Sequence, residues 1–95
     1  MQTQKQAKLK PGRPPGTTSF EPKPARAFGE AVRTIRLNLK ISQEELSNLA
    51  EVERSHMGKI ERGEHLPNFV LILRLAKALG VRPGELVDKA VALLE

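Results

Sequence analysis

Cysteine is absent from the 95-residue chain, and histidine occurs only twice. Without cysteine, the chain has no disulfide, no thiolate metal site and no cysteine nucleophile. The two histidines, His56 and His65, are nine residues apart, which fits no common spacing of two metal ligands on one helix. Paired carboxylates and a glycine-rich phosphate loop are missing as well. These absences argue against an enzyme and predict neither a metal nor another cofactor.

Long apolar runs are also missing. No stretch reaches the length of a membrane span, and the first residues lack the apolar core of a secretory signal. We therefore expect a cytoplasmic protein. The length leaves room for one small domain, so we expect no separate effector domain and no small-molecule ligand.

Positive charge is concentrated at one end of the chain. The whole sequence holds 16 lysines and arginines against 11 aspartates and glutamates, a net charge of +5. Residues 1–24 contain five of these basic residues, a single acidic residue and five of the seven prolines. Such a segment cannot bury enough apolar surface to offset its ordering entropy, so we predict a disordered basic arm over 1–24 and one folded domain over 25–95. A basic chain suits an anionic partner, and nucleic acid is the leading candidate.

Apolar residues recur at helical spacing from Ala25 onward. The first helix is predicted from Ala25 to near Asn38, with an inward face formed by Phe28, Ala31, Val32, Ile35 and Leu39. Further helices are predicted over 43–50, 54–62, 69–79 and 83–93. No segment alternates with the period of a strand, so the expected fold class is all-α, with five helices.

Several helix ends carry recognisable signals. Ser42 followed by Glu45 has the spacing of a capping box before the second helix. Asn68 can cap the start of the fourth helix, and Gly80 can end it.

Apolar side chains outnumber the needs of a small core in the last two helices. We expect an inward face in the fourth helix from Phe69, Ile72, Leu75, Ala76 and Leu79, and in the second from Leu46, Leu49 and Ala50. The apolar residues left over are Val70, Leu71, Leu73, Val87, Val91 and Leu94. Because exposed apolar patches usually mark interfaces, we predict that these residues form a homodimer interface. The alternative is that the core absorbs most of them.

The helices over 43–50 and 54–62, joined by a tight turn, fit a helix-turn-helix unit. In such a unit the second helix places side chains against base edges in the major groove of DNA. Met57 and Ile60 would dock this helix on the core. Its outward polar residues are Arg54, Ser55, His56 and Lys59, and Gly58 would allow a close approach to the groove.

Three stretches resemble the Cro- and phage-repressor-like helix-turn-helix family, also called the XRE family. They are Ile41-Ser42-Gln43-Glu44-Glu45-Leu46, then Ile60-Glu61-Arg62-Gly63, then Pro67 through Leu79-Gly80-Val81. The resemblance covers roughly residues 28–88. It implies a compact, lambda-repressor-like five-helix domain that binds double-stranded DNA sequence-specifically, usually as a dimer on a palindromic site.

The resemblance also implies roles for individual residues. Base reading falls to Arg54, Ser55 and Lys59, with Gly58 on the same face, and phosphate binding to Gln43 and Arg62. We add His56 as a phosphate contact, whereas His65, in a loop, is expected to be inert. Arg36 and Glu61 fall where the family forms a partly buried, structural ion pair. For Arg54, Ser55 and Lys59 the alternative is an ordinary solvated helix face.

Two departures from the family pattern affect turns. Glu51 stands where the turn between the second and third helices usually carries glycine, and Lys40 replaces a glycine often found after the first helix. If the backbone at Glu51 is left-handed, the non-glycine residue costs roughly 1–2 kcal/mol.

The arm contains a fragment similar to an AT-hook, which lays an arginine into the minor groove. Its residues are Lys10, Gly12 and Arg13, but Pro11 replaces the second arginine of the fuller motif. We expect the arm to follow the DNA backbone or the minor groove in the complex. The alternative is a flexible leader that adds only non-specific attraction.

Together these patterns predict a non-enzymatic transcription regulator that binds operator DNA as a homodimer. It would be associated with the nucleoid and would act by blocking or contacting RNA polymerase or another partner protein. The alternative function is a helical protein-interaction module, antitoxin-like or scaffold-like, whose apolar surface on the last two helices binds a partner protein.

Overall fold

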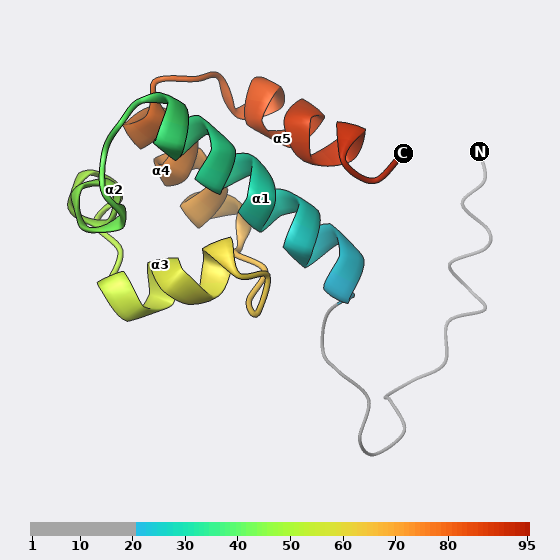
Figure 1. The fold of residues 1–95 in the computed structure, drawn as a ribbon, viewed down its shortest axis with the longest axis horizontal. Helices are drawn as coiled ribbons and strands as arrows, with labels where there is room; N and C mark the ends of the chain where they lie inside the picture. Colours follow the sequence, from blue (N-terminus) through green and yellow to red (C-terminus); the bar gives the residue numbers. More distant parts are fainter. Residues whose placement is uncertain (1–20) are drawn as a thin grey trace, which may run out of the picture.

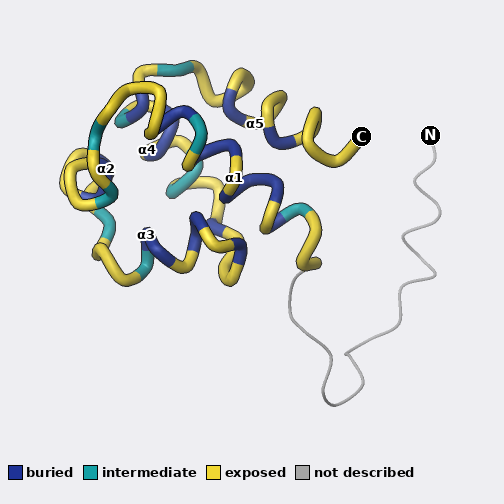
Figure 2. The backbone as a smooth tube through the Cα atoms, viewed as in Figure 1, coloured by how far each residue is buried: buried dark blue, intermediate teal, exposed yellow. Residues whose placement is uncertain are grey.

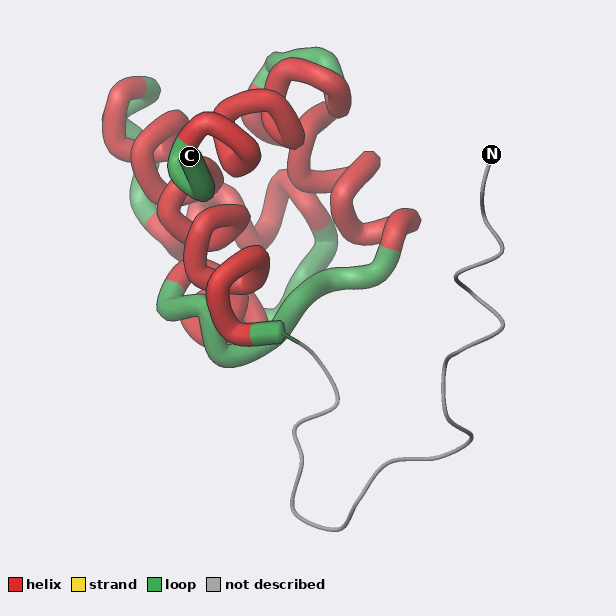
Figure 3. The backbone as a smooth tube through the Cα atoms, turned by 90° about the vertical axis from the view of Figure 1, so that its right-hand side faces the viewer, coloured by secondary structure: helices red, strands yellow, loops and turns green. Residues whose placement is uncertain are grey.

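Five α-helices make up the folded part of the chain (Figure 1): α1 (Pro22–Asn38), α2 (Gln43–Ala50), α3 (Arg54–Glu61), α4 (Phe69–Leu79) and α5 (Pro83–Ala92). This computed structural model describes residues 21–95, and no strand occurs among them (Figure 3). The all-α, five-helix prediction is confirmed. The predicted arm contacts Lys10, Gly12 and Arg13 lie outside the described residues.

Helix α1 begins three residues earlier than predicted. Pro22 and Pro24 lie in its first turn, where backbone N–H groups have no partner within the helix and proline is tolerated. The predicted boundary between arm and domain at residue 24 is therefore too late, because residues 22–24 are helical. The ends of α3 at Glu61 and α5 at Ala92 each lie one residue before the predicted ends.

Local side-chain caps define the starts of α2 and α4. The Ser42 hydroxyl accepts a hydrogen bond from the Glu45 backbone N–H at 2.9 Å, and the Glu45 carboxylate accepts one from the Ser42 N–H at 2.8 Å. This is the predicted capping box. Asn68 accepts a hydrogen bond from the Leu71 N–H at 2.9 Å, and Gly80, with φ 73°, ends α4.

Helix α1 is the central element of the packing. It contacts α3 on one side and α5 on another, while α2 packs against α3 and α4 (Figure 1). The buried faces of the helices turn toward one another (Figure 2). The largest fully buried side chains are Leu46, Met57, Ile60, Leu75, Leu86 and Val32. Two of them, Met57 and Ile60, belong to α3 and anchor it on the core, as predicted.

Three apolar residues predicted to face inward are exposed instead. Phe69 is 72% exposed, Leu49 is 61% exposed and Leu39 is 48% exposed. Phe69 is the first residue of α4, Leu49 lies next to the last residue of α2, and Leu39 follows the end of α1. All three lie at or just beyond a helix end, where helical spacing did not predict burial correctly.

Gly29 allows α1 and α3 to touch through their backbones. A Cβ atom at this position would lie 2.8 Å from the Glu61 carbonyl oxygen and closer still to that of Ile60. Only glycine fits such an approach without a shift of one helix. No local sequence motif predicts this role of Gly29.

None of the helices among the described residues is long and apolar enough to cross a membrane.

Candidate nucleic-acid interface

The outer face of α3 carries polar and cationic side chains. Ser55, Lys59 and Arg62 follow one another at spacings of four and three residues, and all three are exposed. This spacing places them along one side of a helix. Arg54 is exposed at the first position of α3. On the opposite side, Met57 and Ile60 are fully buried and dock the helix on the core.

A buried ion pair connects α3 to α1. Arg36 donates from Nε to Glu61 Oε2 at 2.7 Å and from Nη2 to Glu61 Oε1 at 3.0 Å. Its third nitrogen donates to the Ile41 carbonyl at 3.0 Å. Arg36 and Glu61 are only 8% and 7% exposed, so the predicted pair is present and buried. Through Arg36, this ion pair connects the end of α3 to Ile41, which lies between α1 and α2.

Gln43 extends this network to α2. Its Nε2 donates to Glu61 Oε1 at 3.0 Å, and its side chain is half-buried. One carboxylate therefore receives hydrogen bonds from α1 and α2 while it belongs to α3. The Glu61 carboxylate therefore connects α3 to both α1 and α2.

Gly58 is not part of the exposed face on which it was predicted to lie. It is buried, and a Cβ atom there would lie 2.9 Å from Arg62 Nη1 and 3.6 Å from Gln43 Oε1. The side chains of Gln43 and Arg62 extend over the space that a larger residue would fill. Gly58 therefore leaves room for the side chains of Gln43 and Arg62.

Arg62 is paired on the surface with Glu64. Its Nε and Nη2 atoms donate to the two carboxylate oxygens at 2.9 and 3.1 Å. The hydrogen bonds raise the pKa of Arg62 and lower the pKa of Glu64, because each charged form is stabilised by the other. A predicted phosphate-binding arginine thus already has an anionic neighbour.

The two histidines, far apart in sequence, are in contact. His56 Nε2 lies 2.9 Å from His65 Nδ1, and the two rings meet edge to face with centroids 4.5 Å apart. Partial burial lowers the pKa of His56, the charges of His65 and Lys59 lower it further, and Glu53 opposes them. His65 was expected to make no contact of its own, but the loop after α3 brings its ring against His56.

Both turns that lack the family's glycine have left-handed backbones. Lys40 has φ 61° and Glu51 has φ 59°. Beyond Glu51, the Val52 N–H donates to the Ser47 carbonyl at 2.9 Å, which closes the turn between α2 and α3. The helix-turn-helix geometry therefore forms without glycine, at a cost in backbone strain.

The residues predicted for a dimer interface are mostly accessible. Leu71 is half-buried, and the exposed ones are Val70, Leu73, Val87, Val91 and Leu94. They come from α4 and α5, which pack against each other, except Leu94, which follows α5. The core therefore does not absorb them, with Leu71 a partial exception.

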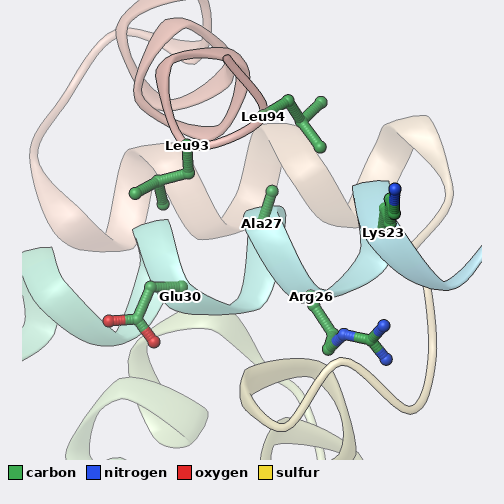
Figure 4. Close-up of a pocket in the computed structure, with 6 residues that line it drawn as sticks. All are labelled: Lys23, Arg26, Ala27, Glu30, Leu93 and Leu94. Atoms are coloured by element: carbon green, nitrogen blue, oxygen red, sulfur yellow. The ribbon is translucent and has the colours of Figure 1, made fainter.

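A pocket lies between the start of α1 and the end of α5 (Figure 4). Leu93 and Leu94 extend toward α1, where Ala27 faces them, and the charged lining residues are Lys23, Arg26 and Glu30. No group of three or more histidine, cysteine, aspartate or glutamate side chains suited to a metal ion occurs in residues 21–95. The pocket is separate from the outer face of α3, which carries the cationic residues.

Sequence comparisons place this arrangement in a known family. The Helix-turn-helix domain family matches residues 27–90. The control protein C.BamHI of Bacillus amyloliquefaciens is 40% identical over 62 residues, which cover 64% of this chain and 76% of that protein. The immunity repressor protein of Bacillus phage phi105 is 28% identical over 67 residues, which cover 70% of this chain and 46% of the repressor.

Solved structures agree with this assignment. The restriction-modification controller protein C.AhdI from Aeromonas hydrophila is 40% identical with a TM-score of 0.64, over 65% of this chain and 94% of that one. The clp gene regulator ClgR from C. glutamicum has the same fold, with a TM-score of 0.74 at 24% identity over 79% of this chain and 97% of that one. The chain therefore belongs to the helix-turn-helix family and is a DNA-binding transcription regulator of the Cro and phage-repressor type, related to restriction-modification controller proteins.

Proposed function

We propose that the protein binds operator DNA sequence-specifically as a homodimer, with α3 in the major groove. The observation that carries this proposal is the exposed polar face of α3 on a helix held by the buried Arg36–Glu61 pair. A fixed helix presents its side chains in one geometry, which base recognition requires. In this proposal Arg54, Ser55 and Lys59 read base edges.

Phosphate contacts would flank these bases. We assign them to Gln43 at the start of α2, His56 on α3 and Arg62 directly after α3. Gln43 has its amide nitrogen engaged with Glu61, so its orientation is set before DNA arrives. Arg62 would exchange Glu64 for a phosphate oxygen, since both are anionic acceptors of the same two N–H groups.

The dimer would form through the apolar residues of α4 and α5. Support comes from the exposure of Val70, Leu73, Val87, Val91 and Leu94, with Leu71 at the edge. A two-fold axis would place two recognition helices about 34 Å apart on one face of the duplex. Such a dimer would act at a promoter by blocking or contacting RNA polymerase.

The basic arm would add contacts outside the major groove. We propose that Lys10, Gly12 and Arg13, outside the described residues, follow the backbone or the minor groove in the complex. Deletion of residues 1–20 spares α1 and should flatten the dependence of affinity on salt. An unchanged salt slope would refute this role.

The decisive experiment selects bound DNA from a random pool and then tests two variants on the selected site. Arg54→Ala/Lys59→Ala should abolish selective binding without loss of helicity. Arg82→Ala/Lys89→Ala removes the same charge from the α5 region, which packs on α1 and α4, and should retain selective binding. Equal binding by both variants would refute the base-reading role of α3 and favour the protein-interaction alternative.

The selected site and the solution mass test the dimer separately. Two inverted half-sites one helical turn apart are expected. Sedimentation should give a dimer that Val87→Asp/Val91→Asp converts to a folded monomer. A wild-type monomer at micromolar concentration, bound to a single half-site, would refute the homodimer.

A further inference from the structure

The contact between His56 and His65 joins the recognition helix to the loop that follows it. His56 is half-buried on α3, and His65 is exposed between α3 and α4. Their facing nitrogens are 2.9 Å apart, so one nitrogen must donate a hydrogen to the other. The contact therefore exists only while at least one of the two nitrogens lacks a proton.

We propose that His65 belongs to the DNA-facing surface together with His56, and that the pair takes up a proton as a DNA phosphate approaches. DNA binding would then strengthen as the pH falls from about 8 to about 5.5. This inference rests on the proposed function, because it assigns a regulatory property to the same binding surface.

The charges around the pair set the direction of the effect. Lys59 on α3 opposes protonation of His56, whereas Glu53 at the start of α3 favours it. In the loop, the Glu64 carboxylate is paired with Arg62 in the free protein. A phosphate near Lys59 would reverse this balance, since its negative charge favours the imidazolium form.

The sign follows from linkage between protons and DNA. Burial, His65 and Lys59 hold the pKa of His56 below its ordinary value in the free protein, and a nearby phosphate would raise it in the complex. The gain in DNA affinity is therefore complete at a pH below the pKa that His56 has in the free protein. It is lost as the pH rises through the higher pKa that His56 would have in the complex.

Other side chains contribute little in this pH range. Histidine and cysteine are the side chains whose ordinary pKa lies in or near this range, and the chain has two histidines and no cysteine. A pH-dependent affinity that involves side chains can therefore be traced to this pair by substitution.

The experiment measures the affinity of the full chain for a fluorescent duplex of random sequence, from pH 5.5 to 8 at constant ionic strength. Because phosphates are the same in every sequence, no operator is required. Wild type should gain roughly three- to tenfold in affinity toward low pH, as uptake of up to one proton allows. His65→Gln should reduce this gain, and His56→Gln/His65→Gln should remove it.

Proton chemical shifts of the two rings, followed during pH titration with and without DNA, give an independent readout. DNA should raise the midpoint of at least His56, which a merely structural contact would not do. Identical pH slopes for wild type and the double variant, with DNA binding retained, would refute the inference and leave the proposed function intact. No binding by wild type at any pH in low salt would refute both.

Discussion

Arg36 of α1 and Glu61 of α3 form two hydrogen bonds, 2.7 and 3.0 Å long, although both residues are more than nine-tenths buried. Gln43 of α2 donates to the same carboxylate at 3.0 Å. A single carboxylate on α3 therefore accepts hydrogen bonds from both α1 and α2. Because Glu61 is the last residue of α3, fold stability and the orientation of the exposed polar face of α3 depend on the same contact.

Removal of one partner of this pair should be costly. Arg36→Met leaves the Glu61 carboxylate buried without its cation, and we expect a loss of about 3–5 kcal/mol in the free energy of unfolding. Urea denaturation followed by circular dichroism measures the loss. Arg36→Met/Glu61→Met should lose much less than the sum of the two single variants, and additive losses would contradict the coupling.

Gly29 should tolerate no side chain. In Gly29→Ala the new methyl group meets the backbone of α3, with the Glu61 carbonyl oxygen 2.8 Å away. We expect about 1–3 kcal/mol of destabilisation from the forced separation of α1 and α3. Gly84→Ala is the matched control, because nothing lies within 4 Å of its Cβ position and it is also helical. It should gain about 0.4–1 kcal/mol, and equal effects at both sites would disprove the steric explanation.

The two left-handed turn residues should be improved by glycine. Lys40 and Glu51 have φ 61° and 59°, where a side chain costs about 1–2 kcal/mol. Part of the relief is offset by the greater freedom of glycine in the unfolded chain, so Lys40→Gly and Glu51→Gly should each gain about 0.5–1 kcal/mol. Thermal unfolding measures the gain. Glu44→Gly, at an exposed helical position of α2, should instead lose about 0.5–1 kcal/mol, and a loss in all three variants would contradict the strain.

Glu64 should weaken DNA binding, since its carboxylate holds the Arg62 guanidinium at 2.9 and 3.1 Å. In Glu64→Gln a phosphate no longer competes with a fixed anion, and affinity at low salt should rise roughly two- to fivefold. Fluorescence anisotropy with duplex DNA checks this. Glu85→Gln, an exposed position on α5, removes the same charge and should have a smaller effect. Stability should stay unchanged in Glu64→Gln, because the Arg62–Glu64 pair is exposed to solvent.

Helix boundaries and the helix-turn-helix assignment could be predicted because their determinants are local. The capping box of Ser42 and Glu45 acts within four residues, and so does the left-handed Gly80 that ends α4. The start of α1 was missed by three residues because proline at a helix start resembles proline in an extended arm.

The exposed face of α3 was predicted with one error. Polar character separates Ser55 and Lys59 from the buried Met57, but the family resemblance also placed Gly58 on the outer face. Gln43 and Arg62 extend over that glycine, and no local pattern shows where long polar side chains from other turns will lie.

The sequence by itself determined the helices, their caps and the cationic character of α3, because these depend on residues within a few positions of one another. The tertiary structure alone decided that His56 meets His65, that Gly29 lies against the α3 backbone and that Phe69 remains uncovered. Each of these relationships depends on where separate helices and loops come to rest. That placement follows from the packing of the whole core rather than from any short stretch of chain.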